Sequence, residues 1–291
     1  MINMPNTEFV KAVEWIFNTN ENNADIDVVS TLAILKLYEI HSIELDKSFK
    51  NKIAVILNKN EVLSYHKNDL ITSLLSALIV IEYGNQFQTE YTFKYLSILD
   101  EFQKNSSEES LNSILLNGFF NNVEKASIES DIFIKWHENN IEETLKKLMF
   151  KIELGSHFGM LHLKLPSGVL NYLEGAIIYF MKQYDLPMMM RCLRSLNYIA
   201  STHTSLAIKT GISFLKHQQT FDGSFGDYET SLSNIKDIKE RTVQEMKIKT
   251  PISIQALWTL YELESNNNLL KILAKQFACL KNLNENMDCY A

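Results

Sequence analysis

The amino-acid sequence predicts an all-α protein, and three observations support this fold class. Apolar residues recur at helical spacing along most of the 291 residues. No segment shows the sustained alternation of apolar and polar residues, rich in β-branched side chains, that is typical of a strand. The chain contains 9 glycines and 4 prolines, and this low content favours long helices over many tight turns.

The expected helices follow one another with short polar breaks between them. Asparagine-rich breaks lie at 18–23 and 266–268, and breaks with Gly, Ser or Pro lie at 84–85, 105–107 and 166–167. The expected helices lie near residues 6–18, 27–41, 46–58, 69–84, 89–104, 107–121, 124–138, 141–153, 168–183, 187–200, 203–217, 233–247, 251–264 and 267–282.

The composition indicates the compartment of the protein and argues against some classes of partner. The formal net charge is -7, which argues against a nucleic-acid partner because phosphate binding needs clustered Lys and Arg. The longest apolar stretches, 70–81 and 168–181, are shorter than the roughly 20 residues that span a bilayer, so we expect core helices and no transmembrane segment. The first residues do not resemble a secretory signal. The cysteines, Cys192, Cys279 and Cys289, lack disulfide or zinc spacing, and we expect a cytoplasmic protein.

An internal repeat is visible in the helical pattern. Residues 27–40 align with 250–263, with Ser, Ala and a Leu-Tyr-Glu triplet at matching positions, and the preceding segments 15–21 and 214–220 also correspond. Residues 69–82 are a looser third copy. Each copy is a helix, a polar loop and a second helix, a unit that buries its apolar face only by stacking on neighbours.

The most informative segment is 214–227, which runs from an apolar helix into Gln218-Gln219 and then into Asp-Gly-Ser-Phe-Gly at 222–226. Gly223 permits backbone angles that other residues reach only at a cost. Asp222 before a glycine is a turn signal, because its carboxylate accepts hydrogen bonds from nearby backbone amides. We expect the two glutamines to bond the free carbonyls at the end of the preceding helix, and Phe225 to fold back onto that helix.

This segment resembles the repeat motif of α/α-toroid proteins, namely the triterpene and diterpene cyclases and the β subunits of protein prenyltransferases. The resemblance is specific over 214–264. It implies a single (α/α)6 toroid over residues 1–291, in which about twelve helices alternate between an inner and an outer ring. An open α-helical solenoid is the competing architecture. In the family the motif staples neighbouring outer helices, and the alternative is that Asp222 or Asp227 binds a substrate.

Residues 228–249 interrupt the copy that carries the motif. The segment is rich in Lys, Arg, Asp and Glu and is absent between the corresponding helices of the first copy. We interpret it as a charged insertion with a surface helix. It is either a lid over one mouth of the toroid or a solvated excursion on the rim.

Catalytic candidates come from comparison with the family's chemistry. Class II terpene cyclases protonate their substrate with an Asp-x-Asp-Asp motif, and Asp25-Ile-Asp27-Val28 keeps two of its three acids. Two close carboxylates entering an apolar cavity can share a proton, so Asp25 and Asp27 are candidate catalytic acids. Asp27 also stands where a helix N-cap belongs, and capping is the alternative role.

The other chemistries of the family lack their residues. No Asp-Asp-x-x-Asp run is present for magnesium and diphosphate, and neither a Cys-His pair nor a cysteine soon after the motif is present for zinc, so we expect no metal and no cofactor. Among the histidines, His203 is a candidate general base and His157 a candidate substrate-binding residue. A capping or core role is the alternative for both.

Two functions therefore remain open. The first is a terpene-cyclase-like enzyme that acts on an isoprenoid or another apolar small molecule in a central cavity, by acid-initiated cyclisation. The second is a non-catalytic toroid that binds a peptide or lipid as an accessory protein of a biosynthetic pathway. The sequence leans toward the enzyme because a closed ring of helices creates a concave centre suited to small molecules. A homodimer is left open.

Overall fold

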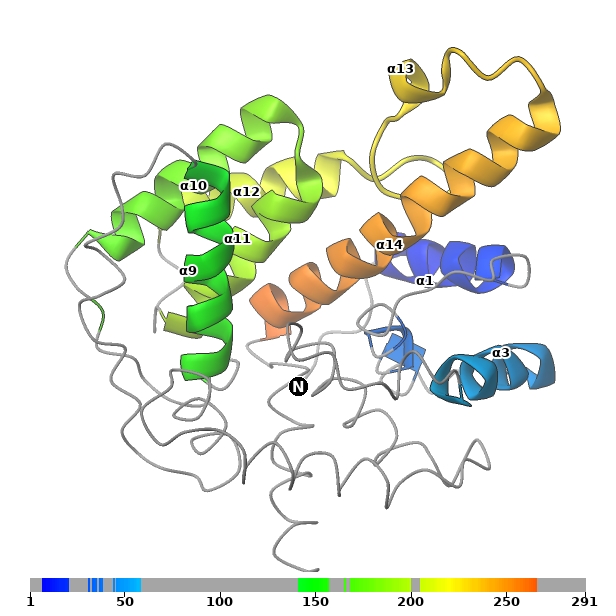
Figure 1. Ribbon diagram of the computed structural model, residues 1–291, viewed down its shortest axis with the longest axis horizontal. Coiled ribbons are helices and arrows are strands. Elements are labelled where there is room, and N and C mark those ends of the chain that lie inside the picture. The colour runs from blue at the N-terminus through cyan, green and yellow to red at the C-terminus, as the bar shows by residue number, and fades with distance from the viewer. Residues whose placement is uncertain are drawn as a thin grey trace, which may run out of the picture.

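The computed structural model describes residues 7–20, 31, 33–35, 37–38, 44, 46–58, 141–156, 165, 168–199 and 205–265 (Figure 1). The described residues are mostly helical and contain no strand, and their isolated β-bridge pairs Gln219 with Phe225. The expected all-α class is therefore confirmed for this part of the chain. The helices expected at 69–84, 89–104, 107–121, 124–138 and 267–282 lie outside the described residues.

The helices agree with the sequence pattern over most of the described chain. Six of them begin and end within a few residues of the expected positions: α1 Thr7–Asn20, α3 Lys47–Asn58, α9 Ile141–Gly155, α10 Val169–Gln183, α11 Leu186–Ile199 and α12 Leu206–His217. They are followed by α13 Glu229–Leu232 and α14 Ile238–Ser265. Residues 31, 33–35 and 37–38 are also helical.

Helix α11 lies at the centre of the packing. It contacts α9, α10, α12 and α14, and α10 also contacts α12 (Figure 1). Its buried residues include the three consecutive methionines Met188, Met189 and Met190. Because α11 is covered on most sides, its polar residues must find partners inside the protein.

A two-residue connection sets the angle between α10 and α11. Tyr184 adopts the left-handed conformation at φ 57°, and its amide and that of Asp185 bond the carbonyls of Met181 and Phe180 at 3.2 and 3.0 Å. This pattern closes the end of α10. The Asp185 carboxylate then accepts the Met188 amide at 3.1 Å, which caps the start of α11.

Helix α14 corrects one expectation. We expected separate helices at 233–247 and 251–264, but residues 238–265 form one helix with Pro251 inside it. Proline removes a backbone hydrogen bond and usually ends or kinks a helix. Here the residues after Pro251 are mostly buried, including Ile254, Ala256 and Leu257, and this burial holds the helix across the proline.

The charged segment 228–249 is therefore only partly a separate excursion. It contains α13, a loop and the first half of α14, which is largely exposed while the second half enters the core (Figure 1). Helix α1 lies against α14, so the first and last helices of the described chain are neighbours. Among the described helices, none is long and apolar enough to cross a membrane.

Candidate functional site

The motif forms a compact clasp, which we define as residues 218–228. Its backbone turns twice, with φ of 99° at Gly223 and 91° at Gly226, both in the region that favours glycine. The Thr220 amide donates to the Ser224 carbonyl at 2.8 Å, and the Gly226 amide donates to the Gln218 carbonyl at 2.8 Å. The clasp is thus closed on itself immediately after α12.

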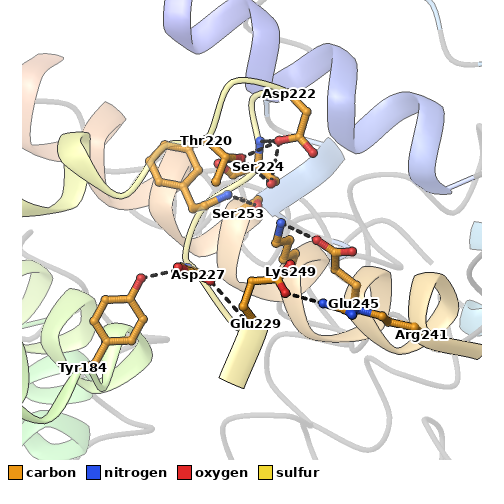
Figure 2. A network of polar contacts seen from close by, with 11 residues as sticks. Tyr184, Thr220, Asp222, Ser224, Asp227, Glu229, Arg241, Glu245, Lys249 and Ser253 are labelled. Carbon is orange, nitrogen blue, oxygen red and sulfur yellow. Dashed lines mark hydrogen bonds and ion pairs between the residues drawn. The ribbon is translucent and has the colours of Figure 1, made fainter. Parts of the chain in front are cut away.

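Asp222 organises the tip of the clasp, as the turn signal predicted. Its Oδ1 accepts the Ser224 amide at 3.0 Å, the Ser224 hydroxyl at 2.7 Å and the Thr220 hydroxyl at 2.5 Å (Figure 2). Burial raises the pKa of Asp222, but the hydrogen bonds from Thr220 and Ser224 outweigh it, so the pKa lies below its usual value. Asp222 is therefore an ionised acceptor that serves the turn.

The clasp holds α1 through a glutamine. Gln219 Nε2 donates to the Glu8 carbonyl of α1 at 2.7 Å and to the Gly223 carbonyl at 3.2 Å. A Cβ on Gly223 would stand 2.5 Å from the Lys11 carbonyl oxygen, so only glycine allows the turn to approach α1 this closely. The expectation that Gln219 bonds the carbonyls at the end of α12 was wrong, because α1 packs beside the loop and offers its own carbonyl.

Tyr184 connects the clasp to α10. Its hydroxyl donates to Gln218 Oε1 at 2.7 Å. The same hydroxyl accepts the Asp227 amide at 2.8 Å (Figure 2). Gln218 therefore also has its partner in another element, contrary to the expected bond to the end of α12. The Tyr184 ring makes edge contacts with Phe214 and Tyr228, which fix the position of the hydroxyl.

The clasp joins α14 through Phe225. The Phe225 amide donates to the Ser253 hydroxyl at 2.9 Å, and the Phe225 side chain is 1 % exposed. The Phe225 ring is therefore buried, and its expected packing on α12 stays a prediction. Since the same loop also contacts α1 and α10, it fastens three helices to the end of a fourth.

Asp227, the second acid of the motif, continues into the insertion. Its Oδ1 accepts the Glu229 amide at 3.0 Å and so stabilises the first turn of α13. Glu229 forms an ion pair with Arg241 of α14, which ties α13 to the exposed half of α14 (Figure 2). Asp222 and Asp227, the candidate substrate-binding acids, thus both have structural partners.

The remaining predicted site residues are not placed. Asp25, Asp27, His157 and His203 lie outside the described residues. Asp25 and Asp27 precede the helical residues 31–38, whose described apolar side chains are buried.

Sequence reasoning missed a buried polar seam between α11 and α14. Arg194 is 6 % exposed, and its Nη1 donates to Thr259 Oγ1 at 2.5 Å and to the Gln255 carbonyl at 3.5 Å. Its guanidinium lies 4.5 Å from the centroid of the Trp258 ring, a favourable cation–π contact. The available signal in the sequence was Arg194 itself, a charged residue within a segment, 186–199, that is rich in methionine and leucine.

The seam continues one turn further along both helices. The Tyr198 hydroxyl donates to Glu262 Oε2 at 2.9 Å, and burial, followed by the Glu262 charge, raises the pKa of Tyr198 well above its usual value. On the other side of α11, Arg191 donates two hydrogen bonds to the Glu153 carboxylate of α9, at 2.7 and 2.6 Å. These pairs specify which faces of the helices meet.

Two further findings bear on function. Within the described ranges, no group of His, Cys, Asp and Glu is suited to hold a metal ion. No protein-family model, no curated protein and no solved structure matches the chain.

Proposed function

We propose that the chain is a closed α/α toroid that binds an isoprenoid or another apolar small molecule at the centre of its ring. The order of contacts supports this architecture. Helix α11 contacts its neighbours α10 and α12, and helices one place further along also contact each other: α9 with α11, α10 with α12, and α11 with α14 across the short α13. Alternating inner and outer helices produce this pattern.

The observation that carries the proposal is the bond between the clasp and α1. Gln219 and Glu8 are 211 positions apart, yet the loop after α12 holds the first helix of the chain. Helix α1 also packs on α14. In an open solenoid each repeat contacts only its neighbours, so the first and last units stay apart. A closed ring brings them together.

We infer the class of ligand from the hydrogen bonds that the acids of the clasp already make. Asp222 and Asp227 already accept hydrogen bonds within the loop, so recognition does not rest on the acids of the motif. A ring of helices leaves a concave centre, and such sites are lined mostly by apolar and aromatic side chains. The chain supplies 16 Phe, 12 Tyr and 3 Trp. These features favour an apolar ligand.

Acid-initiated cyclisation of that ligand is the second candidate function. It is favoured by the position of Asp25 and Asp27 ahead of helical residues that enter the core, with Ala33 and Ile34 buried. An acid at the mouth of an inner helix would face the ring centre, where a low dielectric keeps a carboxyl group protonated. His203 is the candidate general base in this mechanism.

Ligand binding is tested with the full chain and a series of farnesol, geranylgeraniol and squalene. Intrinsic tryptophan fluorescence follows binding, and a detergent control removes effects of lipid aggregates. We expect saturable binding with a preference for one chain length. Absence of saturable binding for every member of the series would overturn the proposed function.

Catalysis is tested in the same samples by mass spectrometry of the extracted lipid. Cyclised product in the wild type, lost in Asp27→Asn while binding is retained, supports the cyclase. Unchanged lipid together with saturable binding supports the non-catalytic toroid. Thermal unfolding of Asp27→Asn is the control, because asparagine caps a helix about as well as aspartate and stability should change little.

A further inference from the structure

Helix α10 carries an exposed face that the packing of the described residues does not use. Its buried side is Val169, Leu173, Ala176, Ile177 and Phe180. Outside this buried side, Leu170, Ile178 and Tyr179 are 43, 36 and 49 % exposed. At 100° per residue, Ile178 lies opposite the buried side, and Leu170 and Tyr179 lie roughly 80° and 100° to either side of it. Exposed large apolar side chains gathered on one helix mark an interaction surface.

Gly175 is a second, independent feature of this face. It lies inside α10, and a Cβ there would meet nothing within 4 Å. Gly211 of α12 differs, because a Cβ there would stand 2.9 Å from Leu193 Cδ2, so close helix packing explains that glycine. Glycine is disfavoured in a helix interior relative to alanine, and no contact in the described part of the chain explains Gly175. A helix from outside the chain, approaching closely, would explain it.

The charges on this face of α10 indicate which helix approaches it. Glu174 and Lys182 lie four residues on either side of Ile178 on the same face. Neither makes an ion pair with any described residue. If a second α10 crosses antiparallel with Ile178 on the two-fold axis, Glu174 of each copy faces Lys182 of the other. A parallel pairing would instead bring like charges together. The face is complementary to itself, which is what a two-fold interface requires.

We propose that a second copy of this chain docks antiparallel on α10, with Ile178 at the centre. Gly175 gives the partner helix room, and two Glu174–Lys182 pairs close the interface. A single helix pair buries a small area, at the low end for specific interfaces, so the dimer is weak and depends on concentration. This inference does not depend on the ligand proposed above.

The test is charge reversal followed by sedimentation velocity over a range of protein concentrations. We expect reversible dimerisation of the wild type, and an increase of about tenfold or more in the dissociation constant for Glu174→Lys and for Lys182→Glu, because each places like charges opposite each other. The double variant Glu174→Lys with Lys182→Glu restores the complementary pairing and dimerises as the wild type does.

The centre of the face has its own pair of variants. Ile178→Glu abolishes dimerisation, whereas Leu206→Glu on α12, at a position 78 % exposed, leaves it unchanged. Circular dichroism verifies that each variant is folded, as expected for substitutions at exposed positions. A monomeric wild type at all concentrations, or single reversals that dimerise as the wild type does, would overturn the proposal. A double variant that stays monomeric would show that the pairing is not antiparallel across Ile178.

Discussion

At the scale of single residues, Gly223 is the point where sequence and packing are most tightly linked. Its φ of 99° favours glycine, and its missing side chain lets the clasp reach the Lys11 carbonyl of α1. Gly168 has a similar φ of 106° but open space around it. Substitutions at these two glycines therefore distinguish the free-energy cost of a left-handed backbone from the cost of a steric clash.

We predict that Gly223→Ala lowers the free energy of unfolding by several kcal/mol, because a left-handed alanine costs roughly 1 kcal/mol and the clash with Lys11 is with backbone that must move. Gly168→Ala is the control and should lose only the first, smaller amount. Urea denaturation measures both. Equal losses in the two variants would show that the clasp does not press on α1.

Asp222 makes the stability of the clasp depend on pH. Its pKa is lowered in the folded protein, so it stabilises the fold above its unfolded pKa of about 4, and this contribution is lost as the pH falls through the folded value. We predict that Asp222→Asn flattens the fall in stability between about pH 5 and pH 2. Unfolding midpoints across this range test the prediction. Asp237→Asn is the matched control, because Asp237 is exposed and its Oδ1 accepts the Glu240 amide at 2.8 Å. An acid profile identical to that of the wild type would contradict the role of Asp222.

The sequence predicted the residues of the clasp more successfully than their partners. Asp222 and Gly223 form a turn through neighbours in sequence, so the pattern was sufficient. The partners Glu8 and Tyr184 are far away in sequence, and a glutamine at a helix end carries no information about which carbonyl will lie beside it. Only the packing of α1 and α10 decides this.

At the scale of elements, helix periodicity placed α1, α3 and α9–α12 well but failed at α14. The reason is that a proline destabilises a helix at one position, whereas the stabilisation from burial adds up over many side chains. Ile252, Ile254, Leu257 and Leu260 are all buried just after Pro251, and each contributes about 1.5–3 kcal/mol. This exceeds the roughly 3 kcal/mol that an internal proline costs, so the helix continues.

We predict that Pro251→Ala raises the free energy of unfolding by roughly 1–3 kcal/mol, because the alanine amide can bond the Lys247 carbonyl that Pro251 leaves without a helical donor. Pro187→Ala is the control. Pro187 lies in the first turn of α11, where the amide has no helical partner, and we expect little change. A destabilised Pro251→Ala would mean that the proline shape is required where α14 enters the core.

At the scale of the whole molecule, the first and last described helices are in contact. α1 packs on α14, and Gln219 bonds Glu8, while Ala12, Val13 and Ile16 of α1 are buried. The repeat in the sequence predicted that helices stack. It could not predict which ends meet, because an open stack and a ring share the same local pattern.

Helix α1 is held by residues far along the chain, and this should slow the exchange of its amide hydrogens. Helices with few tertiary contacts open locally and exchange quickly. We predict that α1 exchanges as slowly as α11, because the two share one cooperative unit through α14 and the clasp. In Gln219→Ala, which removes a bond worth about 1 kcal/mol, exchange in α1 should accelerate about fivefold while exchange in α10 and α11 stays the same. Hydrogen exchange followed by mass spectrometry resolves these segments. Fast exchange of α1 in the wild type, or uniform acceleration of all helices in the variant, would show that the ends are not joined by the clasp, and the ring would lose its main support.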